Sequence, residues 1–159
     1  MKIEGAKILV TGGAGLIGST TIDQLLANES PAEIVILDNM SRGTTRNLEN
    51  ALKDKRVKLI QGDIRDKDLV YKVTEGMDAV IHMAAIRITA CAADPREAME
   101  VMNDGTFNVI DAARQAGVKK VLAASSASIL GLADSFPTTE DHHPYNNRTW
   151  YGASKIMLE

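Results

Sequence analysis

The sequence predicts an α/β fold built on a doubly wound parallel sheet, and three observations support this. Apolar runs of strand length alternate along the chain with segments of helical periodicity. Most of the connections between them are short. A glycine-rich turn at residues 11–18 joins the first run to the first helical segment. Such alternation gives a parallel sheet covered on both faces, and right-handed crossovers make it doubly wound.

The alternation places five strands and four helices. Strands are expected at residues 6–10, 33–37, 57–61, 79–82 and 120–125. Helices are expected at residues 19–28, 66–74 and 94–117, and from Tyr151 onward. Residues 131–149 have no apolar periodicity, and loops of this length in compact domains tend to be functional or mobile.

The helix at residues 94–117 has the clearest boundaries. Asp94 is its expected N-cap, Pro95 takes the first helical position, Glu97 completes a capping box, and Gly117 ends the helix. Its apolar face consists of Ala98, Val101, Met102, Gly105, Val109, Ala112 and Ala113.

Length and composition indicate one domain over residues 1–159. The chain is 45% hydrophobic, and a chain of this size buries roughly 70% of its unfolded surface. A net charge of −3 without a basic patch argues against nucleic acid and anionic membranes as partners. Cys91, the single cysteine, is read as a reduced thiol. With no apolar segment of spanning length, and with Met1 almost at the first strand, we expect a cytoplasmic protein without a secretory leader.

The glycine-rich turn has the spacing of a dinucleotide-binding loop. Gly12 allows a sharp turn, Gly15 allows the backbone to approach a pyrophosphate, and Gly18 allows close packing of helix and strand. Leu16 and Ile17 belong to the same loop, and the N-terminus of the helix that follows offers unpaired N–H groups to the phosphates. The turn therefore predicts a Rossmann-type cofactor site.

The second strand ends at the position of the ribose ligand. Asp38 stands twenty residues after Gly18, where a carboxylate meets the adenosine ribose hydroxyls. That carboxylate would repel a 2′-phosphate, so NAD is the favoured cofactor. Arg42 keeps NADP open, because a guanidinium pairs well with a phosphate.

A tyrosine and a lysine four residues apart supply the candidate chemistry. Tyr151 and Lys155 share one face of a helix, and an ammonium there stabilises a phenolate. Tyr151 is thus a candidate general base. It would take the proton of a sugar hydroxyl while the carbon that bears this hydroxyl gives a hydride to NAD. Ser125 and Ser126 follow the fifth strand, and parallel sheets place their sites at that end. The alternative for the pair, an ordinary surface contact, is disfavoured by the glycine loop upstream.

On these residues the chain resembles the extended short-chain dehydrogenases/reductases, in the group of NAD-dependent sugar-nucleotide epimerases and dehydratases. The resemblance covers essentially all of the chain and is specific for the superfamily rather than for the substrate. The matching segments are TGGAGLIG (11–18), LDNMSRG (37–43), GDIRD (62–66), HMAA (82–85), DGTFNV (104–109), SSAS (125–128) and YGASK (151–155).

The resemblance implies roles for particular residues. Ser126, Tyr151 and Lys155 match the catalytic hydroxyl, the base and its partner. The implied cofactor contacts are Gly12, Gly15, Leu16, Ile17, Gly18, Asp38, Asn39, Arg42, Asp63, Ile64, Ala84, Ala85, Arg87, Tyr151 and Lys155. Asp63 and Ile64 would border the adenine, and Ala84 and Ala85 would line the cleft. His82 is expected to be structural.

The resemblance also narrows the reaction. Dehydratases of this group carry an Asp-Glu pair after the catalytic hydroxyl, whereas this chain has Ala127 and Ser128. We therefore expect C4 epimerisation of a nucleotide sugar through transient hydride transfer and a 4-keto intermediate. The alternatives are a related NAD(P)-dependent sugar-nucleotide dehydrogenase or reductase with net hydride transfer, and an inactive NAD-binding fragment.

The chain departs from the family pattern at three places. Met102 stands where the family often has asparagine, and Asn103 lies about 100° further around the helix, so it is no simple replacement. Leu130 replaces a common aromatic residue. Residues 140–143, Glu-Asp-His-His, lack metal-ligand spacing, and we expect no metal there.

The length raises an expectation about the whole protein. Family members are roughly twice as long, so we expect this chain to be the N-terminal part of a larger enzyme, incomplete within the helix that carries Tyr151. The substrate-binding domain would lie beyond residue 159, and the fifth strand would form an exposed edge. A homodimer is expected for the full protein, through the helix at residues 94–117 and the helix from Tyr151.

Overall fold

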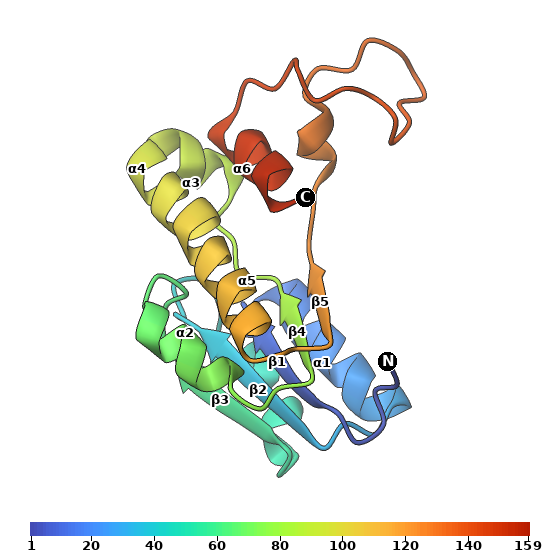
Figure 1. The fold of residues 1–159 in the computed structure, drawn as a ribbon, viewed down its shortest axis with the longest axis vertical. Coiled ribbons are helices and arrows are strands. Elements are labelled where there is room, and N and C mark those ends of the chain that lie inside the picture. The colour runs from blue at the N-terminus through green and yellow to red at the C-terminus, as the bar shows by residue number, and fades with distance from the viewer.

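The computed structural model describes all of residues 1–159 and contains one sheet of five strands in the order β3-β2-β1-β4-β5 (Figure 1). The strands are β1 (Lys7–Thr11), β2 (Glu33–Asp38), β3 (Val57–Gln61), β4 (Ala79–His82) and β5 (Lys120–Ala123). All four pairings between neighbours are parallel. The doubly wound parallel sheet predicted from the sequence is therefore confirmed.

Helices connect and cover the strands. The α-helices are α1 (Leu16–Asn28), α2 (Lys67–Thr74), α3 (Ile88–Ala93), α4 (Pro95–Ala98), α5 (Thr106–Gln115) and α6 (Trp150–Leu158). Tighter single turns are η1 (Thr45–Leu48), η2 (Ala51–Lys53) and η4 (Ala127–Leu130), and η3 (Met99–Gly105) has the wider π-helical turn. None of these helices combines the length and the apolar content that crossing a bilayer demands.

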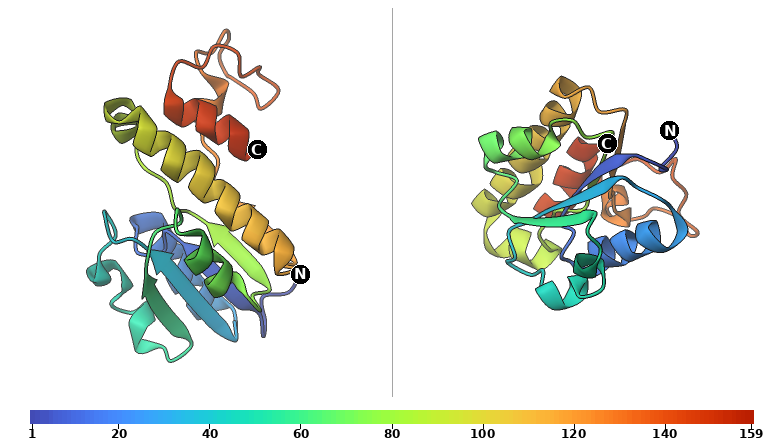
Figure 2. Two further views of the ribbon diagram at one scale, coloured as in Figure 1. Left: turned by 60° about the vertical axis from the view of Figure 1, so that its left-hand side comes forward. Right: turned by 90° about the horizontal axis from the view of Figure 1, so that it is seen from below.

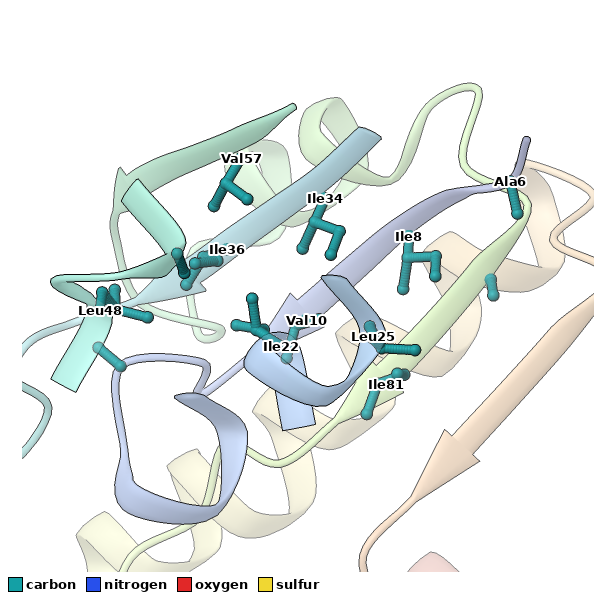
Figure 3. Close-up of a cluster of buried hydrophobic side chains, with 13 residues drawn as sticks. Ala6, Ile8, Val10, Ile22, Leu25, Ile34, Ile36, Leu48, Val57 and Ile81 are labelled. Atoms are coloured by element: carbon teal, nitrogen blue, oxygen red, sulfur yellow. The ribbon is translucent and has the colours of Figure 1, made fainter. Parts of the chain in front are cut away.

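The core is divided between the two faces of the sheet. On one face α1 packs through Ile22 and Leu25 against alternate strand residues, among them Ile8 and Ile36 (Figure 3). On the other face α2 and α5 cover a second cluster that includes Leu9. The side chains of successive β1 residues thus pack on opposite faces of the sheet. Because both faces are buried, the strand is an unbroken apolar run.

Three consecutive elements, α4, η3 and α5, form one continuous rod beside the sheet (Figure 2). Asp94 caps it as predicted, because its carboxylate accepts the N–H of Glu97 with Pro95 in the first turn. The second contact of a capping box, from the Asp94 N–H to the Glu97 side chain, is absent. The N–H of Asp94 already donates to the carbonyl of Ala90, the last turn of the short helix α3.

Several predicted boundaries need correction. Helix α1 begins at Leu16 rather than at residue 19, because Gly15 is already its N-cap. Strand β5 ends at Ala123, so Ser125 and Ser126 lie in the segment after the strand and not at its last residues. Helix α3 and the π-helical turn were not predicted. A six-residue helix has too few turns to display an apolar period.

Two surface features agree with expectation. Strand β5 is an edge strand, with Val121 37% and Leu122 52% exposed. Residues 131–149 contain no helix or strand and extend away from the sheet (Figure 1).

Candidate active site

The glycine loop lies at the point where the strand order reverses. Strand β1 has β2 on one side and β4 on the other, and ligands of open α/β sheets bind at such a switch point. Gly12 has φ +69°, and a Cβ there would lie 2.6 Å from the backbone nitrogen of Ala84. At Gly18 a Cβ would lie 2.5 Å from the carbonyl oxygen of Gly12. Two of the three predicted glycines are therefore needed for the fold of the loop itself.

Gly15 differs from both, because the neighbouring chain leaves room beside it. A Cβ there would meet only the Gly12 carbonyl oxygen, at 3.3 Å. Gly15 is also the N-cap of α1 and has no side-chain cap, and the first turn holds no acidic residue. Leu16 and Ile17 in that turn are exposed. This helix N-terminus fits a pyrophosphate, because its N–H groups and dipole attract an anion.

Asp38 ends β2 beside this loop and is 8% exposed. One of its carboxylate oxygens, Oδ2, accepts the N–H of Ala14, and Oδ1 accepts the N–H of Met40, each at 2.9 Å. Met40 has φ +60°, an uncommon conformation for a residue with a side chain. Asp38 thus holds the glycine loop while keeping lone pairs for the ribose hydroxyls predicted for it. Arg42 is exposed nearby in the chain.

Asp63 follows β3 and is fixed by two neighbours. Its carboxylate forms a double hydrogen bond with the Arg65 guanidinium and accepts the Asn39 amide at 2.9 Å. Arg65 lowers the pKa of Asp63 to about 2. The side chain of Ile64 instead belongs to the core and packs against Gly105. Asp63 and Ile64 are the pair expected at the adenine, and Ile64 could contact it only through main-chain atoms.

The segment after β4, residues 83–87, begins beside the glycine loop, because a Cβ at Gly12 would meet the backbone of Met83 and Ala84. The Ala84 N–H donates to the Thr11 hydroxyl at 3.4 Å, and the Ile86 N–H donates to the sulfur of Met102 at 3.4 Å. Ala84 and Ala85 are half-buried, and Arg87 is the exposed N-cap of α3. We call residues 83–87 the cleft wall.

Tyr151 and Lys155 lie on α6, above the carboxyl ends of the strands (Figure 1). The Lys155 Nζ lies 5.9 Å from the centroid of the Tyr151 ring. It also donates to the carbonyl of Ala124, just after β5, at 2.5 Å. Lys155 is only 5% exposed, and burial lowers the pKa of its ammonium. The two side chains predicted to work together are therefore brought together.

Ser126 precedes the η4 turn, and its hydroxyl oxygen accepts the N–H of Ser128 at 3.1 Å. Two residues that were not predicted fix α6 next to this turn. Asn147 donates to the carbonyl of Ser128 at 2.6 Å and accepts from Thr149, whose hydroxyl caps the Gly152 N–H of α6. A threonine directly before the first residue of a helix is an N-cap signal that could have identified Thr149.

His82 is buried and bridges two elements, as its structural interpretation requires. One ring nitrogen lies 2.6 Å from the Thr11 hydroxyl, and the other lies 3.1 Å from the Thr106 hydroxyl of α5. Burial, assisted by the charge of Lys155, lowers the pKa of His82 to about 4. The ring is neutral at pH 7 and ties β1 to α5.

Asp134, His142 and His143 gather in the long loop, with their ligand atoms within 4.8 Å of one another. Their polar atoms are largely engaged with each other. The Nε2 of His142 accepts the N–H of Asp134 at 3.1 Å, and His143 Nε2 lies 2.8 Å from the Asp134 carboxylate. This cluster closes the loop on itself, and the absence of a metal remains a prediction.

Comparison with known proteins identifies the family of this chain. The sequence profile of the family described as "NAD dependent epimerase/dehydratase family" matches residues 8–159. The UDP-glucose 4-epimerase of Mycolicibacterium smegmatis is 39% identical over 156 residues, covering 96% of this chain and 49% of that protein. The UDP-glucose 4-epimerase of Bacillus subtilis is 38% identical over 158 residues, covering 96% and 45%. The chain spans about half the length of the curated relatives it matches.

Two solved structures from enzymes of this kind have a closely similar fold. The UDP-N-acetylglucosamine 4-epimerase of Methanobrevibacter ruminantium, in complex with UDP-N-acetylmuramic acid, has a TM-score of 0.89 at 28% identity and covers 98% of this chain and 49% of its own. The dTDP-glucose 4,6-dehydratase DesIV of Streptomyces venezuelae, with NAD and TYD bound, has a TM-score of 0.88 at 35% identity, with coverage of 96% and 49%. With its glycine loop, Asp38 and the Tyr151–Lys155 pair in one fold, this chain belongs to the NAD dependent epimerase/dehydratase family.

Proposed function

We propose that this chain provides the NAD-binding and catalytic part of a nucleotide-sugar 4-epimerase. The observation that carries the proposal is the pairing of Tyr151 with the buried ammonium of Lys155 above the strand ends of the sheet whose first turn, the glycine loop, fits a pyrophosphate. The similarity to UDP-glucose 4-epimerases supports a UDP-sugar as the substrate class.

In this proposal NAD contributes reversible hydride acceptance from a carbon that bears a hydroxyl group. Gly12, Gly15 and Gly18 would admit its pyrophosphate, and Asp38 would bind the adenosine ribose. Tyr151 removes the proton of the C4 hydroxyl, and Lys155 stabilises the phenolate through its charge. Because burial already disfavours the charged ammonium, a nearby negative phenolate is a favourable neighbour for it.

Ser126 assists as a hydrogen-bond partner of the substrate. Its oxygen already accepts the N–H of Ser128, so its own hydroxyl proton is free to be donated. Residues Ala127 and Ser128 of the η4 turn carry no carboxylate, and neither can act as the acid or base of a dehydration. This supports epimerisation over elimination, although the dehydratase DesIV has the same fold.

The proposal is tested by measuring the epimerase activity of the Tyr151→Phe variant, made in the full protein that the gene encodes. We expect interconversion of UDP-glucose and UDP-galactose to fall by about 10²- to 10⁴-fold, the usual contribution of general acid–base catalysis. NAD binding, measured by calorimetry, should persist. Tyr145→Phe is the matched control, because Tyr145 is 86% exposed in the long loop and should leave the rate unchanged.

Three results would contradict the proposal. Near wild-type epimerisation by Tyr151→Phe would refute the assigned base. Stoichiometric NADH accumulation with a sugar nucleotide would instead favour the alternative, a dehydrogenase or reductase with net hydride transfer. An intact mass near 17.1 kDa for the native protein, together with NAD binding and no turnover, would favour an inactive NAD-binding fragment.

The proposal includes a homodimer of the full protein. Phe107 (64% exposed) and Ile110 (40% exposed) on α5 support it, because apolar side chains on an exposed helix face are suited to pack against a partner. Sedimentation of the full protein tests this part separately.

A further inference from the structure

Met102 belongs to a buried cluster against which both the cleft wall and the candidate base pack. It lies in the η3 turn, is 3% exposed, and forms a small buried cluster with Cys91 and Ala98. Ala85 and Ile86 of the cleft wall pack against this cluster, and so does Tyr151. The wall and the candidate base therefore share one packing cluster, of which Met102 is a member.

The sulfur of Met102 also makes a directed contact. It accepts the main-chain N–H of Ile86 at 3.4 Å. The first part of the wall is held differently: the N–H of Met83 donates to the carbonyl of Thr11, and that of Ala84 donates to the Thr11 hydroxyl. The wall thus has two anchors, β1 at its start and Met102 at its middle.

The neighbouring amide does not take over this role. Asn103 donates its Nδ2 to the sulfur of Met99, and its Oδ1 is buried without a partner. Within this π-helical turn it is the Met102 side chain that lies next to the Ile86 N–H. Turns of this kind occur frequently at functional sites.

We infer that Met102 is a positioning residue whose sulfur, by accepting the Ile86 N–H, sets the cleft wall in the geometry that binds NAD. This rests on the proposed function, since it assigns the wall to the cofactor site. Met102 touches no reacting atom in this role. It acts through the main chain of residues 85–87.

Three substitutions separate the hydrogen bond from simple packing. Met102→Leu keeps the apolar volume and removes the acceptor, and volume-conserving exchanges of this type are tolerated best in cores. Met102→Gln restores an acceptor on a side chain of similar length. Met99→Leu is the matched control, because Met99 lies in the same turn and its sulfur accepts from Asn103 instead of from the wall.

The experiment measures NAD affinity by calorimetry and exchange of the Ile86 amide proton by NMR, both on the full protein that the gene encodes. We expect Met102→Leu to weaken NAD binding about three-fold, the lower range for a neutral hydrogen bond, and to speed exchange at Ile86. Met102→Gln should recover both values, and Met99→Leu should change neither.

Wild-type NAD affinity and Ile86 exchange in folded Met102→Leu would overturn the inference. So would equal losses in Met102→Leu and Met102→Gln, since packing alone would then explain them. Failure of the wild-type chain to bind NAD would count against the proposed function instead. In that case the exchange rate at Ile86 still decides whether Met102 holds the wall.

Discussion

Protonation of His82 should destabilise the fold between pH 6.5 and pH 4. The ring is buried between Thr11 and Thr106, and its pKa is lowered from the ordinary 6.5 to about 4. As the pH falls, the unfolded chain binds this proton first, so stability is lost across this window and levels off below the folded pKa. Above pH 6.5 both states are neutral at this site and the contribution is fully present.

The size of the effect follows from the difference between the two pKa values. Each pKa unit corresponds to about 1.4 kcal/mol, so protonation should cost about 3 kcal/mol in total. Because native domains are stable by only about 5–15 kcal/mol, a loss of this size is readily measured. Carboxylates such as Asp63, with a pKa of about 2, lose their contribution at lower pH.

The assay is urea unfolding of the wild type and of His82→Gln at several pH values from 7.5 to 4. The difference between the two curves removes the titration of all other groups. We expect the wild type to lose about 3 kcal/mol more than the variant over this range. Parallel curves would refute the reasoning, and so would an NMR titration in which the His82 ring protonates near pH 6.5.

Three further predictions concern the glycine loop and Asp38 beside it. Gly18→Ala should lower both NAD affinity and the free energy of unfolding, the latter by about 1–3 kcal/mol, because its Cβ meets the backbone of Gly12 and Gly13. Gly15→Ala should lower NAD affinity with little loss of stability, since its Cβ meets only one atom at 3.3 Å; calorimetry and urea unfolding of both variants check this contrast, and equal stabilities would contradict it. Asp38→Asn should cost about 1–3 kcal/mol, because both carboxylate oxygens accept main-chain N–H groups and an amide must turn a donor toward one of them. An unchanged urea midpoint for Asp38→Asn would show that one of these contacts is dispensable.

The strands could be predicted from the sequence because each buried strand is a continuous apolar run. In β1 and β2 neighbouring residues such as Ile8 and Leu9 serve opposite faces, so the whole segment must be apolar. The ends of elements were harder to predict. The junction of α3 and the rod depends on Asp94, whose N–H donates to the Ala90 carbonyl of α3 while its carboxylate caps α4.

For the candidate site, the sequence predicted that Tyr151 and Lys155 lie close together and that Asp38 lies beside the glycine loop, but not the contacts that hold them there. The glycines, Asp38 and the Tyr151–Lys155 pair follow from spacing along the chain. Asn147 and Met102 do not, because each acts through a contact with a distant part of the backbone. Such contacts leave no periodic signal, and only the folded chain brings their partners together.

These contacts have a common origin in the geometry of parallel sheets. At the carboxyl ends of the strands the ladder of main-chain hydrogen bonds stops, although the chain there is still partly buried and its N–H groups need acceptors. In this chain side chains supply the acceptors along the cleft: Asp38 for Ala14 and Met40, Thr11 for Ala84, Met102 for Ile86, Asp63 for Arg65, and Ser126 for Ser128. Each such acceptor fixes a piece of backbone before any ligand arrives. Ordering the cleft in advance lowers the entropy cost of binding. The residues that complete the fold at this edge are therefore the same ones that shape the site, which is why replacing them should change affinity and stability together.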